Sequence, residues 1–216
     1  MQAVAANNPL GLELDALNAQ LRDATPQEII TFALGLQKKT IVTTSFSPNS
    51  GGLLHMLTRQ QQDLPVIWVD GGYNTRDAYL TADKLISGLS LNMQIYTPEM
   101  TSARRDAVMG IPTGDDPDLH KEFSRQVKVE PFNKAMTQWS PDVWFSGIRR
   151  EETEFRKTLD ILSYDARGIL RVAPLFYWTE EQLEAYMETH ELPSCKRYFD
   201  PTKLNDGAEC GIHTSL

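Results

Sequence analysis

The chain contains 216 residues, of which 41% are hydrophobic and 23% are charged, and its formal net charge at pH 7 is −8. This length fits one domain, and the composition is that of an ordinary globular protein without an apolar run long enough to cross a bilayer. The acidic balance argues against general nucleic-acid binding, which needs a basic surface. We therefore expect neither nucleic acid nor a membrane as a partner.

The N-terminal stretch and the cysteine content indicate a reducing compartment. Residues 1–17 lack the basic start and continuous apolar stretch of a secretory signal, so we expect a cytoplasmic protein. The chain has two cysteines, Cys195 and Cys210, and one chain therefore offers neither a disulfide scaffold nor a four-cysteine zinc or iron–sulfur site. We predict no bound metal, and a reactive thiol is the cysteine chemistry left open.

The first 61 residues predict two helices separated by a strand. Residues 25–28 (TPQE) form a capping box with proline at the first helical position, and the apolar-periodic stretch IITFALGLQ follows them. Residues 40–46 (TIVTTSF) are largely β-branched and precede a loop rich in Ser, Pro, Asn and Gly, which predicts a buried strand. A helix is then expected at 52–61.

The strand, loop and helix unit repeats along the chain. The further expected elements are strands at 65–69 and 92–98, helices at 74–88 and 131–139, a strand within 141–150, an antiparallel hairpin at 161–175 and a helix at 180–190. Asn74 or Thr75 is expected as an N-cap, Gly88 just past the end of that helix, and Thr179 in a second capping box. Residues 110–118, rich in turn formers, predict a mobile loop.

Strands that alternate with helices predict an α/β fold of the Rossmann-like type: a mostly parallel, twisted sheet with helices on both faces. We interpret the chain as one domain with an N-terminal helical segment (1–39), an α/β core (40–190) and a loop-like C-terminal tail (191–216). The tail carries Cys210 and has no sustained periodicity from Pro193 onward.

Candidate binding residues follow the predicted strands, because ligands of an open α/β sheet bind where strands end and helix N-termini offer free amides. The segments SFSPNSGG, DGGYN and SGIRREE occupy such positions. The first offers hydroxyls and amides suited to phosphate, yet it lacks the Gly-Lys-Ser/Thr ending of a Walker A loop. The candidates are Ser45, Phe46, Ser47, Asn49, Ser50, Gly51, Asp70, Gly71, Gly72, Tyr73, Lys128, Gly147, Arg149, Arg150 and Arg156.

Several of these groups also have a structural interpretation. The stretch GIRREETEFRK either forms a pocket for a small polyanion or exposes a helix face with paired charges. Asp70 either binds a ribose or base, or caps the turn after its strand. Lys128 is either a ligand or a solvated lysine. Cys210 is either an incidental thiol or a reactive one, since a protonated His213 stabilises a thiolate three residues away, whereas Glu209 opposes it.

Five segments in order resemble the phosphoadenylyl-sulfate (PAPS) reductases of the adenine nucleotide alpha-hydrolase-like group. They are TTSFSPNSGGLLHML, DGGY, KVEPFNKAM, WFSGIRREE and ECGIH. The resemblance runs from Thr43 to His190 and returns at the tail. It implies a nucleotide-binding core and an enzyme of assimilatory sulfate reduction.

The resemblance also implies a mechanism. Cys210 attacks the sulfonate sulfur of PAPS, which yields an S-sulfocysteine and adenosine 3′,5′-bisphosphate, and thioredoxin or glutaredoxin then releases sulfite. His213 and the basic candidate side chains offset the negative charge of the substrate. Phe123-Ser124 stands where iron–sulfur relatives have a cysteine pair, so the resemblance implies no cluster and PAPS as the substrate. A homodimer is expected.

Two rival hypotheses remain open at this point. The chain is alternatively an ATP pyrophosphatase or adenylyltransferase of the same fold, although the Lys-Asp-Ser that follows Ser-Gly-Gly in those enzymes is absent. It is otherwise a non-catalytic nucleotide-binding homologue, in keeping with its short tail. Cys195 lies outside the family pattern and is either a partly buried loop residue or a thiol that resolves an oxidised Cys210.

Overall fold

One sheet organises the part of the chain that the structure, a computed structural model, describes: residues 8–112, 115–203 and 212. Its strands are β1 (Thr40–Thr44), β2 (Pro65–Val69), β3 (Asn92–Tyr96), β4 (Val143–Phe145), β5 (Leu162–Tyr164) and β6 (Leu170–Val172). Their order is β3-β2-β1-β4-β6-β5, and neighbouring strands are parallel except β5 and β6. The predicted α/β fold class and the predicted hairpin are confirmed.

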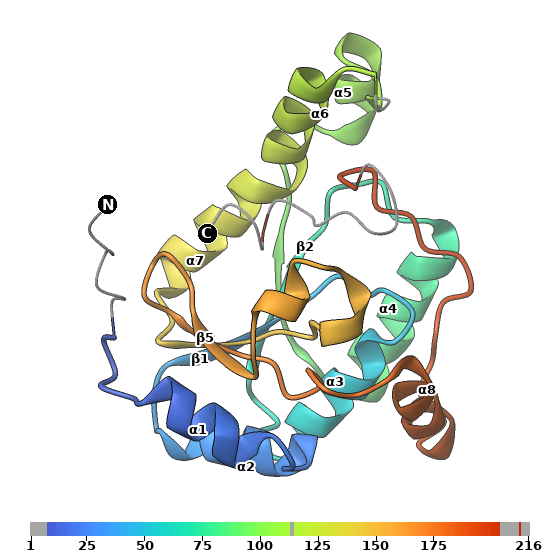
Figure 1. Ribbon diagram of the computed structural model, residues 1–216. Coiled ribbons are helices and arrows are strands. Elements are labelled where there is room, and N and C mark those ends of the chain that lie inside the picture. Colours follow the sequence, from blue (N-terminus) through green and yellow to red (C-terminus); the bar gives the residue numbers. More distant parts are fainter. Residues whose placement is uncertain (1–7, 113–114, 204–211, 213–216) are drawn as a thin grey trace, which may run out of the picture.

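Helices connect the strands and cover the sheet (Figure 1). They are α1 (Leu14–Leu21), α2 (Pro26–Gly35), α3 (Ser50–Thr58), α4 (Arg76–Gly88), α5 (Ser102–Val108), α6 (Pro117–Ser124), α7 (Glu130–Trp139) and α8 (Glu180–Thr189). A π-helical segment at Arg125–Val129 (the π segment) joins α6 to α7, and 3₁₀ turns lie at Arg150–Glu152 and Arg156–Thr158.

Alternate side chains of the strands enter two separate apolar cores. Val42, Val66 and Phe145 pack into the core shared with α2, α3 and α8, whereas Ile41 and Trp144 pack into a second core shared with α7. Successive strand side chains point to opposite faces of a sheet. Burial on both faces therefore explains why the central strands read as nearly continuous apolar runs rather than as alternating ones.

The order of the strands reverses between β1 and β4. The chain moves outward from β1 to β2 and β3, and then returns to place β4 on the other side of β1. The loops that leave the carboxyl ends of β1 and β4 consequently diverge, and such a switch point is where open α/β sheets bind ligands.

The connection from β3 to β4 departs most from the prediction. Helices α5 and α6 project beyond the sheet (Figure 1), and neither was predicted, because charged residues interrupt their short apolar pattern. The predicted loop at 110–118 ends earlier than expected, since Asp116 caps α6 and Pro117 begins it. Residues 113–114 lie outside the described part of the chain, and the predicted mobility stays a prediction.

Side-chain caps define the starts of three of the predicted helices, α2, α4 and α8. Thr25 and Thr179 form the two predicted capping boxes. Thr75, rather than Asn74, caps α4 and accepts the Ala78 amide at 3.1 Å. Gly88 is the last residue of α4 rather than the residue beyond it. The backbone at Gly88 does not take the left-handed conformation that an ending glycine usually adopts.

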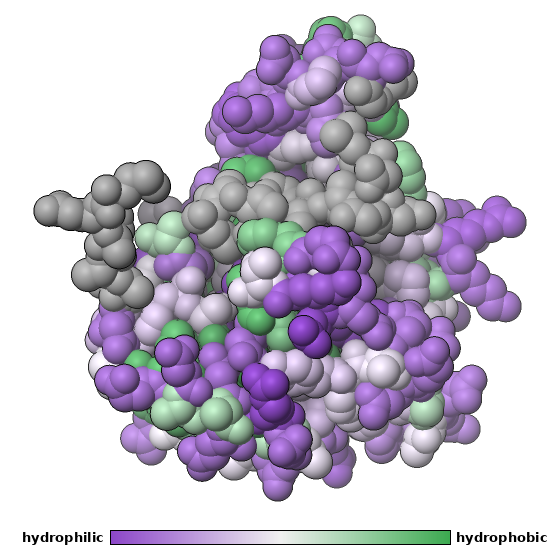
Figure 2. Space-filling view, in the orientation of Figure 1, coloured by the Kyte–Doolittle hydropathy of each residue, from purple (hydrophilic) through white to green (hydrophobic). Residues whose placement is uncertain are grey.

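Within the described residues, no helix combines the length and the apolar character needed to cross a membrane. Figure 2 shows hydrophilic residues dominating the projecting α5–α6 region on the face that it presents. Apolar residues on that face are scattered among polar ones over the rest of the described surface.

Two glycines let α3 pack closely against its neighbours. A Cβ atom on Gly52 would lie 2.6 Å from Leu183 Cδ1 of α8, and one on Gly51 would lie 2.9 Å from Leu85 Cδ2 of α4. Both separations are shorter than carbon–carbon contact allows. These glycines therefore set the position of α3, whose N-terminus follows β1.

We expect Gly52→Ala to lower the free energy of unfolding by about 1–3 kcal/mol, because the added methyl overpacks the contact with Leu183. Gly35→Ala is the matched control: nothing lies within 4 Å of its added Cβ at the end of α2. The control should leave stability unchanged or raise it by up to about 1 kcal/mol. Urea denaturation of both variants measures the difference, and equal effects would contradict the packing argument.

A histidine joins α3 to α8. His55 Nδ1 lies 2.8 Å from the Tyr186 hydroxyl, and the His55 ring centroid lies 4.7 Å from that of His190. Burial, followed by the charges of His190 and Arg59, lowers the pKa of His55. The unfolded chain therefore takes up a proton on this side chain at a higher pH than the folded protein does.

The free energy of unfolding should accordingly decrease as the pH falls below about 6.5, the ordinary histidine pKa that applies in the unfolded chain. His55→Gln removes this titration, so its unfolding free energy should change less between pH 7 and pH 5 than that of the wild type. Urea denaturation at a series of pH values tests this. The same slope in both proteins would show that His55 is not responsible.

Candidate functional site

A cavity of about 340 Å³ opens at the switch point between β1 and β4. Its volume lies within the range of small-molecule sites. The predicted residues that line it are Ser45, Ser47, Asn49, Ser50, Lys128, Gly147, Arg149 and Arg156. The loops after β1 and β4 thus meet as the sequence predicted, and the π segment joins them.

The loop after β1 turns sharply at Phe46, whose φ of 51° is unusual for a residue with a side chain. Its amide donates to Thr44 Oγ1 at 3.2 Å, and its buried ring packs edge-on against Trp68. Phe46 therefore anchors the loop and does not line the cavity. The hydroxyls of Ser47 and Ser50 lie 3.0 Å apart and do line it. Gly51 faces α4 and α8 instead.

The segment after β2 mainly supports the cavity from outside. Asp70 accepts the Gly72 amide at 3.0 Å and the Tyr79 hydroxyl at 2.7 Å, so its carboxylate caps the turn. Burial, and then the hydrogen bond to Asp70, raises the pKa of Tyr79 to about 12. Gly72 has a φ of 80°, which requires glycine. Neither Asp70 nor Gly72 lines a described cavity.

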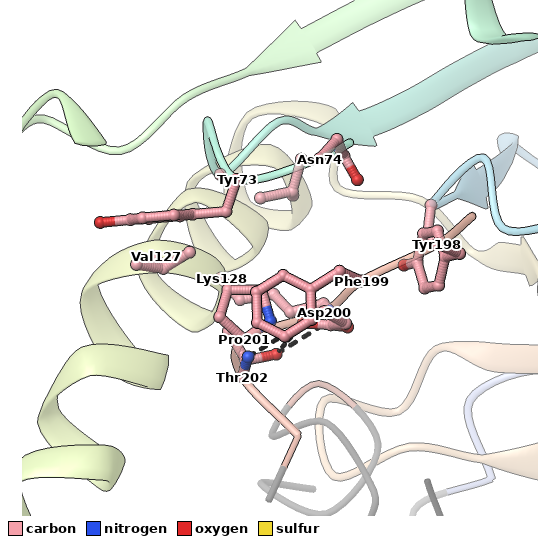
Figure 3. A pocket seen from close by; sticks show the side chains of 12 residues that line it. Tyr73, Asn74, Val127, Lys128, Tyr198, Phe199, Asp200, Pro201 and Thr202 are labelled. Atoms are coloured by element: carbon pink, nitrogen blue, oxygen red, sulfur yellow. Dashed lines mark hydrogen bonds and ion pairs between the residues drawn. The ribbon is translucent and has the colours of Figure 1, made fainter. Parts of the chain in front are cut away.

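Gly71 and Tyr73 line a smaller pocket of about 40 Å³ next to the large cavity, with which it shares Ser45 and Lys128. A Cβ atom on Gly71 would lie 2.7 Å from Val127 Cγ1, so the glycine lets the π segment approach β2. The Tyr73 hydroxyl donates to Asp106 at 2.8 Å and points away from the pocket (Figure 3). Tyr73 therefore lines the smaller pocket with its ring and not with its hydroxyl group.

Arg149 and Arg156 are both buried and both contact glutamates. Arg149 forms ion pairs with Glu151 and Glu180, and Arg156 forms one with Glu152. Glu152 also accepts the backbone amide of Arg149 at 2.8 Å, which fixes the turn after β4. The interpretation as an exposed helix face is wrong, because the stretch forms 3₁₀ turns and these two paired arginines are buried. Both arginines line the cavity, and the pocket for a small polyanion stays a prediction.

Arg150 is exposed and does not line the cavity. Its backbone amide donates to the Phe176 carbonyl at 2.8 Å. Arg149 has an extended backbone, whereas Arg150 begins the 3₁₀ turn, and the first is buried while the second is exposed.

Lys128 reaches the cavity from the π segment. Its ammonium group pairs with Asp200 (Figure 3). The two side chains are 14% and 7% exposed. A π turn inserts an extra residue into a helix, and such turns occur frequently at functional sites. Of the two interpretations of Lys128, the solvated lysine is wrong, because the side chain is mostly buried beside the cavity; its role as a ligand stays a prediction.

The acidic side of the cavity was not predicted from the sequence. Glu152, Glu180 and Asp200 line it together with the basic residues, as do Tyr198 and Lys203. The sequence placed Glu180 at the start of a helix, directly after the N-cap Thr179. Its ion pair with Arg149 could not be predicted, because the two residues are far apart in the sequence. Nothing in the aperiodic stretch 193–203 indicated that it crosses the cavity.

Of the two cysteines, the structure describes Cys195. It is 2% exposed, and its thiol lies 3.7 Å from the Phe46 carbonyl. Burial, and then the charge of Asp77, raises the pKa of this thiol, so it is a poor nucleophile. Cys210 and His213, the predicted catalytic residues, lie outside the described residues, and their roles stay predictions. In the described ranges, no group of three or more His, Cys, Asp or Glu side chains is placed to hold a metal ion.

Comparison with known proteins assigns the family. The model of the phosphoadenosine phosphosulfate reductase domain matches residues 39–201. A phosphoadenosine 5′-phosphosulfate reductase of Photobacterium profundum is 34% identical over 183 residues, which cover 84% of this chain and 72% of the relative. The chain belongs to the phosphoadenosine phosphosulfate reductase family. The predicted resemblance is confirmed, and a reductase of the same description from Synechococcus, 32% identical over 83% of this chain and 78% of its own, agrees.

Solved structures support the family fold. A phosphoadenylyl-sulfate reductase from Candida auris superposes with a TM-score of 0.74 at 22% identity, over 85% of this chain and 88% of that chain. An FMN adenylyltransferase from Candida glabrata superposes with a TM-score of 0.53 at 13% identity, over 73% of this chain and 49% of that chain. Both likenesses concern the fold alone.

Glu152→Gln should lower the free energy of unfolding by about 1–3 kcal/mol. The substitution removes the negative charge that accepts the Arg149 backbone amide and pairs with the buried Arg156 guanidinium, so both contacts become weaker. Glu154→Gln is the control, since Glu154 pairs with Lys157 at the surface with its side chain 88% exposed. The control should change stability by less than about 1 kcal/mol. Urea denaturation compares them, and a smaller effect at Glu152 than at Glu154 would refute the argument.

Proposed function

We propose that this protein reduces phosphoadenylyl sulfate to sulfite and adenosine 3′,5′-bisphosphate with electrons from thioredoxin. The observation that carries the proposal is the meeting of Lys128, Arg149 and Arg156 around one cavity at the switch point of the sheet. Membership of the phosphoadenosine phosphosulfate reductase family supports the choice of substrate.

The proposed first step is an attack of the Cys210 thiolate on the sulfonate sulfur. A sulfur–sulfur bond forms while the bond from that sulfur to the phosphate oxygen breaks, and adenosine 3′,5′-bisphosphate leaves with the electron pair. A thioredoxin thiolate then attacks Cys210 Sγ and expels sulfite. The second thioredoxin thiol resolves the mixed disulfide, so the dithiol supplies the two electrons.

Charge neutralisation is the main task of the described residues. A thiolate and a polyanionic nucleotide repel each other, and buried cations offset that repulsion more strongly than exposed ones do. Arg149 and Arg156 are suited to bind oxyanions through two hydrogen bonds, and Lys128 acts as a point charge. Ser45, Ser47, Ser50 and Asn49 supply neutral hydrogen-bond donors to the same cavity.

The remaining features of the proposal follow from the family and from the composition. Two cysteines cannot supply the four thiolates of an iron–sulfur cluster, so we propose a reductase without a bound cofactor. We further propose a single-domain protein that works as a cytoplasmic homodimer. Its nucleophile lies in the tail that follows residue 190, and His213 assists it.

Intact-protein mass spectrometry tests the proposal directly. After the protein is mixed with PAPS and no reductant, we expect a sulfonate adduct on Cys210, and reduced thioredoxin should remove it as sulfite. Cys210→Ser should lose both the adduct and at least about 1,000-fold in rate, as expected for loss of a covalent nucleophile. Cys195→Ser, at the buried thiol, should keep both.

Three results would contradict the proposal. The first is unchanged sulfite release by Cys210→Ser, and the second is the absence of any adduct in the wild type. The third is magnesium-dependent release of pyrophosphate from ATP, which would favour an ATP pyrophosphatase or adenylyltransferase instead.

A further inference from the structure

The chain after α8 crosses the cavity as a strap, here residues 193–203. Its first half is tied to the N-terminus of α4. Asp77 accepts the backbone amides of Lys196 and Arg197 at 2.6 and 3.1 Å, and the Thr75 hydroxyl donates to the Arg197 carbonyl at 2.6 Å. These bonds hold the strap at one end, outside the cavity.

The second half of the strap is tied by Asp200. One carboxylate oxygen accepts the amide and hydroxyl of Thr202 at 3.0 and 2.6 Å, which shapes the turn, and the other pairs with Lys128 (Figure 3). The Lys203 amide closes that turn on the Asp200 carbonyl at 3.1 Å. Asp200 therefore connects the strap to a cation of the proposed substrate site.

The ion pair is placed where a ligand would compete for it. Lys128 and Asp200 line both the large cavity and the smaller pocket, and their side chains are 14% and 7% exposed. Burial would raise the pKa of Asp200, but the charge and hydrogen bond of Lys128, together with Thr202, lower it overall. The carboxylate is therefore ionised at neutral pH and acts as an internal anion on Lys128.

We propose that Asp200 is a positioning residue that holds the strap closed through Lys128, and that an oxyanion of the bound ligand displaces it and releases the strap. The identity of that ligand as a nucleotide rests on the proposed function. Cys210 follows Asp200 in the same tail. Release of the strap would therefore change the anchor that precedes the proposed nucleophile once anionic substrate has bound.

The test uses hydrogen exchange and calorimetry on the full chain, with inorganic pyrophosphate as the probe. Asp200→Asn removes the charge but keeps an oxygen for the Thr202 bonds, and Asp200→Glu restores the charge. Lys128→Met removes the partner. Asp63→Asn makes the same change of charge at an exposed position and is the matched control.

Without ligand, amide exchange in residues 200–203 should rise at least about tenfold in Asp200→Asn and in Lys128→Met, and should stay at the wild-type rate in Asp200→Glu and Asp63→Asn. Saturating pyrophosphate should raise exchange of the same amides in the wild type. Pyrophosphate should also bind Asp200→Asn about three- to tenfold more tightly than the wild type. A residue that only stabilised the fold would not strengthen anion binding when removed.

The proposal is overturned if exchange in residues 200–203 is unchanged in Asp200→Asn, or if pyrophosphate protects these amides. It is equally overturned if pyrophosphate binds the variant no more tightly than the wild type, or binds neither protein. Failure of the proposed function is a separate result: PAPS would then yield no adduct and no sulfite, while the exchange and pyrophosphate measurements would keep their outcome.

Discussion

The reversal of strand order at β1 is the constraint on which the site depends. Because both faces of the sheet are buried, the loops of the parallel strands emerge at its ends, and those after β1 and β4 leave in different directions. The resulting gap receives a serine-rich loop from one side and Arg149 from the other. The packing of α3 through Gly51 and Gly52 positions one part of the lining, and the π segment contributes Lys128 to it.

Electrostatic balance is the second theme of the site. Each of three cations that line the cavity, Lys128, Arg149 and Arg156, contacts a carboxylate in the protein. Buried cations without such partners would be costly in the absence of ligand. The carboxylates thus let the protein keep three largely buried cations at one cavity in an acidic chain, and an anionic ligand must compete with these carboxylates. In the strap, we propose that a ligand oxyanion competes with Asp200 for Lys128, so that ligand binding changes the conformation of the strap.

Much of the fold was predictable because local signals agreed with the tertiary structure. The capping boxes at Thr25 and Thr179 and the β-branched runs of β1 and β2 marked their elements. The region from α5 to the π segment was not predictable, since its short charged helices are stabilised by contacts such as that of Tyr73 with Phe123. A π turn has no sequence pattern of its own.

The fold class, the family and the set of polar and basic residues at the strand ends were readable in the sequence, because these depend on periodicity, capping and ordered motifs within short stretches. Which of those residues share the cavity was settled by tertiary packing. It separated the buried Arg149 from the exposed Arg150, turned Asp70 to a capping role and brought Asp200 to Lys128. Each of these outcomes depends on packing between segments far apart in the chain, which a local pattern does not record.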